Sequence, residues 1–213
     1  MCGLLALGVF TVACHKTARV RDDADIGHVI KEKSTAVRVA DCDGPARSLP
    51  PELRLALRPR TGQMVPDDHW ADLAERIPGG FAGILYDRNM KPILMLTDPE
   101  RADEVKKVLV SDRTFRHFDL VGARVFKARW DFAQLVDWFN FIVSDTSVWK
   151  TDGMVFGDKD EETNRIYFRV ETEAGRQRLK EKLSALNIPC DLVRIGIGAR
   201  VVPLNPAVIP PFR

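Results

Sequence analysis

The chain has 213 residues, of which 45% are hydrophobic and 29% are charged. This balance is typical of a folded globular protein, and the length is sufficient for one or two domains with an apolar core. The 32 basic and 30 acidic side chains leave a net charge of only +2, which argues against a nucleic-acid partner because such partners require a basic surface. None of the four cysteines forms a CxxC pair, and no His/Cys cluster has metal-ligand spacing. We therefore expect neither a metal nor another cofactor.

The amino-terminal segment is typical of an export signal with a lipid attachment site. Leu4 to Ala13 is an uncharged apolar run of ten residues. This is too short to span a bilayer as a helix, which takes about 20 residues, but it suits the apolar core of a signal peptide. Thr-Val-Ala before Cys14 resembles a bacterial lipobox, so we expect residues 1–14 to be a signal segment and Cys14 to carry a membrane anchor in the cell envelope. The alternative is a buried N-terminal strand or helix.

Two further cysteines bear on the same compartment. If Cys14 is lipidated and Cys2 is removed, Cys42 and Cys190 remain. An oxidising compartment would allow these two to form a disulfide. The alternative is two independent reduced thiols.

Residues 15–66 are predicted to be a tether that ends in a short helical piece. The hydrophobic residues of the tether are scattered, Asp-Gly-Pro at 43–45 breaks regular structure, and only Ala36–Ala40 alternates as a strand would. Pro50 and Pro51 open a short helix that ends by Pro59.

The first folded unit is predicted over residues 67–147. A capped helix over 67–77 precedes a hairpin of the apolar runs 81–86 and 93–97. Thr97 and Glu100 have capping-box spacing, so a helix is expected from there to about residue 110, followed by a strand over 123–129. Asp131 then caps an amphipathic helix whose apolar stripe consists of Phe132, Leu135, Val136, Phe139, Ile142 and Val143.

The second unit, residues 148–202, repeats the order of the first. A hairpin of 154–156 and 165–170 precedes a helix over 173–186, which Asn187 and Pro189 end, and a strand over 192–197. Residues 203–213 form a proline-rich tail. We therefore predict the α+β class, with two tandem ββαβ units, each an antiparallel sheet with a packed helix, joined by a long amphipathic helix.

Four segments carry a resemblance to a known family: ERIPGGFAGILYDRN, ILMLT, ARVFKARWDFAQLVDW and MVFGDKDEETNRIYFRV. Together they resemble the pro-region of α-lytic-protease-like secreted serine proteases over about residues 70 to 200. The matching features are the strand Phe81-Ala82-Gly83, the helix start at Trp130-Asp131 and the hairpin turn from 160 to 164.

In that family the pro-region folds as small α+β subdomains, cradles the protease, speeds its folding and inhibits it. The present chain runs to Arg213 with no GDSGG-like nucleophile segment and no protease after the resemblance. The resemblance therefore implies a free-standing relative of a binding module.

Catalytic residues are hard to place in this sequence. No Ser or Cys stands in a GxSxG context beside a histidine and an orienting acid. We therefore expect a non-catalytic module that binds another envelope protein, such as a secreted protease, by pairing at a sheet edge. One alternative is a small envelope hydrolase with a site built from His69, Asp67 and a further carboxylate. The other is a purely structural envelope protein.

Four acidic residues, Asp158, Asp160, Glu161 and Glu162, crowd the predicted hairpin turn. Calcium binds such oxygen-rich loops, but the EF-hand pattern of a central glycine and a distal glutamate is missing. We therefore expect a solvated turn without metal, in which Asn164 serves the turn itself.

A glycine pair near the last strand and an aromatic pair on the long helix are both expected to have structural roles. Gly196 and Gly198 do not precede a helix, so we expect a bulge or a close backbone approach there and not a phosphate loop. Trp138 and Phe141 lie off the apolar stripe of the long helix. We expect both in the core, and a contact patch is the alternative.

Overall fold

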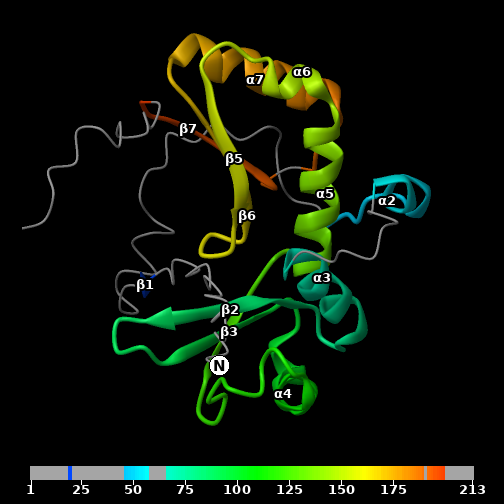
Figure 1. Cartoon of the computed structure of the whole chain (residues 1–213), viewed down its shortest axis with the longest axis vertical. Helices are drawn as coiled ribbons and strands as arrows, with labels where there is room; N and C mark the ends of the chain where they lie inside the picture. Colours follow the sequence, from blue (N-terminus) through cyan, green and yellow to red (C-terminus); the bar gives the residue numbers. More distant parts are fainter. Residues whose placement is uncertain (1–18, 21–45, 58–65, 190, 200–213) are drawn as a thin grey trace, which may run out of the picture.

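The computed structural model describes residues 19–20, 46–57, 66–189 and 191–199. These residues contain two units, each with the order strand, strand, helix, strand (Figure 1). The predicted α+β class and the two tandem ββαβ units are thus confirmed. The predicted strand Ala36–Ala40 and the tail over 203–213 lie outside the described residues.

The first unit is a small sheet with a crossover helix. Strands β2 (Phe81–Asp87) and β3 (Pro92–Leu96) form the antiparallel hairpin, and β4 (Arg124–Lys127) pairs with β3 in parallel. Between β3 and β4 the chain passes through the 3-10 helix η1 (Pro99–Arg101) and α4 (Ala102–Ser111). The short strand β1 (Arg19–Val20) extends this sheet along β2.

The second unit repeats this topology. Strands β5 (Met154–Asp160) and β6 (Arg165–Val170) are antiparallel, α7 (Glu173–Ala185) follows, and β7 (Val193–Ile197) pairs with β6 in parallel. Both sheets are therefore mixed, and the expectation of antiparallel sheets is corrected. The reason is that a crossover helix carries the chain back along the sheet, so the strand after the helix starts at the same end as the strand before it.

The remaining helices flank the two units: α2 (Pro51–Leu57), α3 (Pro66–Arg76), α5 (Phe132–Ser144) and α6 (Thr146–Trp149). The start of η1 differs by one residue from the predicted capping box. Asp98 caps it by accepting the N–H of Glu100 at 3.2 Å, whereas the Thr97 hydroxyl donates to the carbonyl of Gly79. Asp131 forms the predicted cap of α5, as a full capping box with Gln134.

Helix α5 stands between the two units and supplies side chains to both cores. Phe132, Ala133 and Val136 pack in the core of the first unit, while Leu135, Trp138 and Ile142 pack in the core of the second. Its 13 residues make it no longer than α7, so it is a shared core element and not a long connecting rod. Trp138 is buried, as predicted, and Phe141 is partly buried against the same core.

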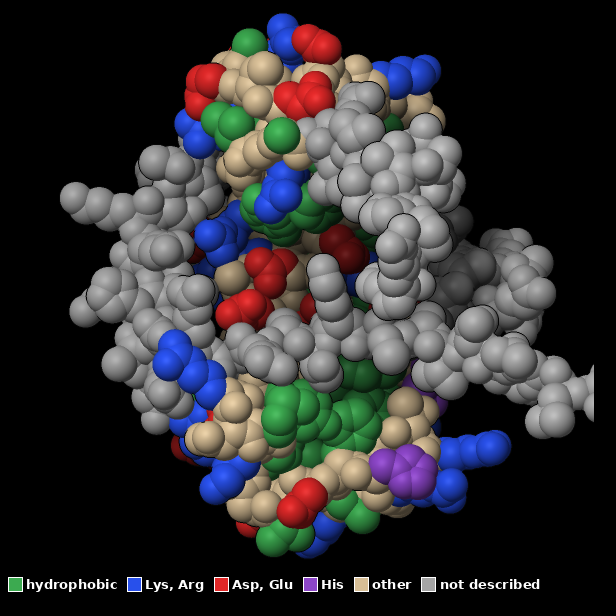
Figure 2. Space-filling view, turned by 60° about the vertical axis from the view of Figure 1, so that its left-hand side comes forward, with side chains coloured by type: hydrophobic (Ala, Val, Ile, Leu, Met, Phe, Trp, Pro, Cys, Tyr) green, Lys and Arg blue, Asp and Glu red, His purple; other side chains and the backbone are tan. Residues whose placement is uncertain are grey.

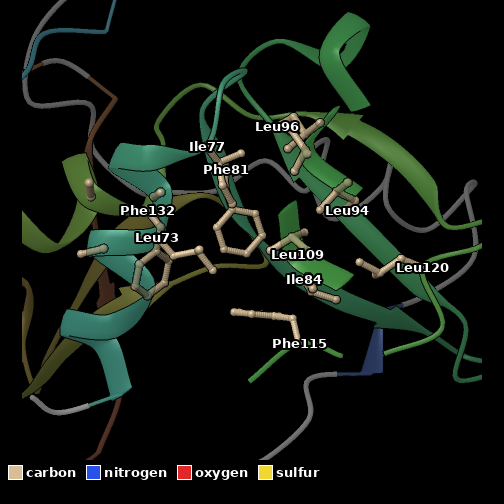
Figure 3. Packing of buried hydrophobic residues seen from close by; sticks show 14 of the residues in the cluster. Leu73, Ile77, Phe81, Ile84, Leu94, Leu96, Leu109, Phe115, Leu120 and Phe132 are labelled. Atoms are coloured by element: carbon tan, nitrogen blue, oxygen red, sulfur yellow. The ribbon is translucent and has the colours of Figure 1, made fainter. Parts of the chain in front are cut away.

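The core of the first unit combines residues of its hairpin and of α4 with residues from the flanking helices α3 and α5 (Figure 3). Leu73 of α3, Ile77 just after this helix and Phe132 of α5 meet Phe81 of β2, and Leu109 of α4 closes the opposite side. In the second unit the predicted alternation holds, since Ile166, Phe168 and Val170 of β6 are fully buried while the residues between them are not. Each fully buried side chain of this size stabilises the fold by roughly 1.5–3 kcal/mol.

A single buried amide connects the turn of the second unit to the entry of α5. Asn164 is only 4% exposed and has a left-handed backbone with φ of 53°. Its Oδ1 accepts the N–H groups of Arg129 and Trp130, both at 2.8 Å, and its Nδ2 donates to the carbonyl of Trp130 at 2.8 Å. Asn164 thus serves the turn, as predicted, and also joins the two units.

Residues 46–57 fall in the segment predicted to be a tether, but they pack against the folded body. Leu49 is 2% exposed and belongs to the core of the second unit. The carbonyl of Arg47 accepts the indole N–H of Trp138 at 2.8 Å, and Arg54 forms ion pairs with Asp137 and Glu75. Scattered hydrophobic residues gave no periodic signal for this docking, because one buried leucine and a few polar contacts are sufficient to hold the segment.

We predict that Asn164→Gly lowers the free energy of unfolding by about 3 kcal/mol, since it removes three buried hydrogen bonds worth about 1 kcal/mol each. Glycine keeps the left-handed backbone, and its greater freedom in the unfolded chain is shared by the control, so the difference between the two variants reports the side chain. The control is Asn187→Gly, at an exposed position with the same φ of 53°, for which we expect a change below about 0.5 kcal/mol. Urea unfolding measures the free energy change of both variants, and equal effects of the two substitutions would contradict the stabilising role of the Asn164 amide.

Candidate functional site

Three of the predicted site residues, Cys14, Cys42 and Cys190, lie outside the described residues. Their lipidation and pairing therefore stay predictions. Among the described helices, none has both the length and the apolar character needed to cross a bilayer.

The hydrolase alternative places His69 and Asp67 in one site, but the structure gives them different partners. Asp67 forms an ion pair with Lys159 at 3.0 Å. The Nε2 atom of His69 lies 3.3 Å from Asp112 Oδ1 and 3.0 Å from the hydroxyl of Thr114. A catalytic triad uses the two ring nitrogens for different partners, the acid on one and the nucleophile on the other. Here the carboxylate and the hydroxyl share a single nitrogen.

Asp112 is the acidic member of this group. Burial by itself would raise the pKa of Asp112, but the N–H of Thr114 and the contact with His69 outweigh it and hold that pKa below its ordinary value. The N–H of Thr114 donates to Asp112 Oδ1 at 2.8 Å, in the loop just after α4. These contacts fix the loop after α4 against α3. A structural role of this kind explains why His69, Asp112 and Thr114 lie together.

The acidic turn between β5 and β6 lies against the first unit. Figure 2 shows Asp and Glu side chains gathered in a hollow between the two units, with Lys and Arg side chains beside them. Asp160 accepts the N–H and the hydroxyl of Thr163, at 3.2 and 2.7 Å. Within the described ranges, no three His, Cys, Asp or Glu side chains are grouped so that they could hold a metal ion.

Lys159 links this turn to the helices. Its side chain is 8% exposed, and its ammonium lies 3.0 Å from Asp67, 3.6 Å from Asp158 and 4.3 Å from the ring centre of Phe139. A cation over an aromatic ring and beside two carboxylates is well compensated for the loss of water. The contact therefore ties the turn of the second unit to α3 and α5.

Glu161 is the titratable group of the turn that the fold perturbs most clearly. Burial raises the pKa of the Glu161 carboxyl, and the nearby charges of Asp158 and Asp67 raise it further, while its own N–H and Lys159 act in the opposite direction. Its side chain lies over Gly83 of β2, where a Cβ atom would be 3.8 Å from the Glu161 Cγ. The partly buried Glu161 side chain is thus held between the units.

The wet face of the second sheet carries a group that the sequence did not single out. Phe156 of β5 stands opposite Arg169 of β6, and their neighbour Tyr167 stands opposite Arg194 of β7. Gly196 lies beneath Tyr167, because a Cβ atom there would be 2.8 Å from the Tyr167 Cζ. The sequence predicted a bulge or a close backbone approach at Gly196, and the structure shows the close approach of a side chain, that of Tyr167. The signal for the group was the alternation of β6, which assigns Tyr167 and Arg169 to the face away from the core.

We predict that Glu161→Gln raises the free energy of unfolding at pH 7. Because folding raises the pKa of Glu161, its ionisation destabilises the fold once the pH is above the ordinary glutamate value of about 4.3. The gain should therefore shrink toward zero as the pH falls below that value. Urea unfolding at pH 7 and pH 4 measures it, with Glu181→Gln on the exposed side of α7 as the control. A gain that is the same at both pH values would refute the buried-carboxyl explanation.

Comparison with known proteins assigns no family to this arrangement. No protein-family model matches the sequence, and no curated protein matches it. A function for the chain must therefore be inferred from the side chains and backbone groups of the described residues.

Proposed function

We propose that this chain is an exported bacterial protein, anchored in the cell envelope by a lipid on Cys14, that acts as a non-catalytic protein-binding module similar to protease pro-regions. The observation that carries the proposal is the edge of the second sheet at β7. In the described part of the chain, β7 pairs only with β6 and is the last strand of its sheet.

The outward backbone groups of β7 follow from its pairing. The Leu192 carbonyl accepts the N–H of Ile166, and the N–H of Gly198 donates to the carbonyl of Val170. In a parallel ladder the bonding residues of a strand alternate, so Arg194 and Gly196 also bond to β6. The N–H and C=O groups of Val193, Ile195 and Ile197 then point away from it. Such a row of groups is a template for a strand from another chain.

The side chains of β7 support the edge as a rigid platform. Val193 and Ile195 are buried in the core of the second unit, so the strand is held in place before any partner arrives. Ile197, at the end of the strand, is 48% exposed and offers an apolar contact. A preformed edge costs little conformational entropy on binding.

The resemblance to protease pro-regions favours a secreted protease as the partner. The hydrolase alternative would require the nucleophile and the acid on different nitrogens of His69, whereas Thr114 and Asp112 contact the same one. The non-catalytic proposal needs only the sheet edge, and it is therefore preferred to the hydrolase.

We predict that the tagged chain captures a protein from envelope extract through β7. Ile197→Pro removes one outward N–H without removing a bond to β6, and we expect about tenfold lower recovery of that protein. Ile197→Val keeps the N–H and should recover it as the original chain does. Protected Gly196 and Gly198 amides in hydrogen exchange check that the proline variant is folded. Failure to recover any protein, or equal recovery with Ile197→Pro, would count against the proposal.

We predict that cells fed a labelled fatty acid attach the label to the chain and that Cys14→Ser abolishes the labelling. Cys2→Ser and Cys42→Ser are the matched controls and should retain it. The physical reason is that a thiol is the acceptor for the lipid, and serine lacks it. Label retained in Cys14→Ser would disprove the anchor, and gel fluorography detects either outcome.

A further inference from the structure

Arg169 lies on the wet face of the second sheet, the face away from the core. Two aromatic rings hold it there in a fixed position. Its guanidinium carbon lies 5.1 Å from the ring centre of Phe156 and 5.8 Å from that of Tyr167. The two rings are themselves 5.6 Å apart in an edge-to-face arrangement. Stacking of this kind orients the planar guanidinium and leaves its outer N–H groups free to donate.

Two glycines shape the floor of this group. Gly196 leaves room for the ring of Tyr167, and a Cβ atom at Gly198 would lie 3.0 Å from the Arg169 Cδ. Side chains at these positions would push Tyr167 and Arg169 away from the sheet. The two glycines, one in β7 and one just after it, therefore leave the space that Tyr167 and Arg169 occupy.

The charge of Arg169 has no carboxylate opposite it within the described residues. Two arginines on α7 of the same unit show the contrast: Arg176 pairs with Glu173 at 2.7 Å, and Arg178 pairs with Asp152 at 2.8 Å. Among the described residues, the guanidinium of Arg169 lies against the rings of Phe156 and Tyr167, with its Nε 3.5 Å from the hydroxyl of Tyr167. An oriented guanidinium without a counter-charge is suited to receive an anion.

The same sheet face indicates which anion fits. Aromatic and arginine side chains on a sheet can also stack nucleic-acid bases. However, Asp158 stands opposite Tyr167 and Asp160 opposite Arg165, toward the turn end of the face. These carboxylates would repel a strand with a phosphate at every nucleotide, whereas a peptide can present one carboxylate at Arg169 alone. Charge complementarity thus favours an acidic protein segment.

We propose that Arg169, Phe156 and Tyr167 form a carboxylate-binding site for an acidic side chain of an extended segment of the partner protein. This inference rests on the proposed function and adds the chemistry of the partner. Bound along the wet face beside β7, the segment would place a glutamate or aspartate on the guanidinium of Arg169.

The experiment uses the isotope-labelled full-length chain and a synthetic probe, acetyl-Ser-Thr-Ser-Glu-Ser-Thr-Ser-amide. We expect saturable NMR shifts at the Arg169 side-chain N–H and at the amides of Phe156 and Tyr167. The same peptide with Gln in place of Glu should bind about tenfold more weakly, because it loses the charged pair. Arg169→Gln should weaken binding of the Glu peptide by a similar factor, whereas Arg178→Gln on α7 should leave it unchanged.

Other outcomes overturn the inference. These are equal binding of the two peptides, unchanged binding by Arg169→Gln, or the lack of a saturable shift on this face. An oligothymidylate of seven nucleotides is the further probe. If it shifts the NMR signals of Arg169, Phe156 and Tyr167 more strongly than the peptide does, the site is assigned to single-stranded nucleic acid instead.

The outcome is separable from that of the edge proposal. If the peptides fail but capture from envelope extract depends on the N–H of Ile197, the carboxylate site is wrong and the binding module stands. If the peptide binds through Arg169 while no envelope protein is captured, the site stands and the proposed partner class fails.

Discussion

The side-chain amide of Asn164 is the contact on which the arrangement of the two units depends. The position requires a residue that tolerates a left-handed backbone and that offers a donor and an acceptor on the same short side chain. Asparagine meets both conditions, whereas glycine meets only the first. The amide fixes the turn against Arg129 and Trp130, and Lys159, at the end of β5 next to this turn, reaches Asp67 and Phe139. With the turn held in this way, the sheet behind it keeps a fixed orientation to the first unit.

The parts of the fold that depend on local pattern were predictable from the sequence. Alternation placed β6, the Asp131 cap placed α5, and Asn187 ended α7 with the expected left-handed backbone. The direction of the strand after the crossover helix, β4 in one sheet and β7 in the other, does not follow from local pattern, although the helix before it requires a parallel pairing.

Contacts between distant segments were beyond the reach of sequence patterns. Asn164 meets residues 129 and 130, which lie 35 and 34 positions away, and no periodicity relates them. Leu49 is a single apolar residue in a polar stretch, yet it is buried in the second core. The partners of His69 were equally hidden, because Asp112 and Thr114 approach it only when the loop after α4 lies against α3. Composition and spacing describe local preference, and they do not describe which surfaces meet.

The sharing of α5 has a consequence for how the repeated pattern is understood. Helix α5 contributes Phe132 and Val136 to one core and Leu135 and Ile142 to the other. Neither repeat therefore forms a complete hydrophobic core without this helix. A gene fragment that ends between the repeats would expose one flank of the helix to water and yield an aggregation-prone half. Because both interiors include side chains of α5, we expect the two repeats to unfold in a single cooperative transition and not as two autonomous domains.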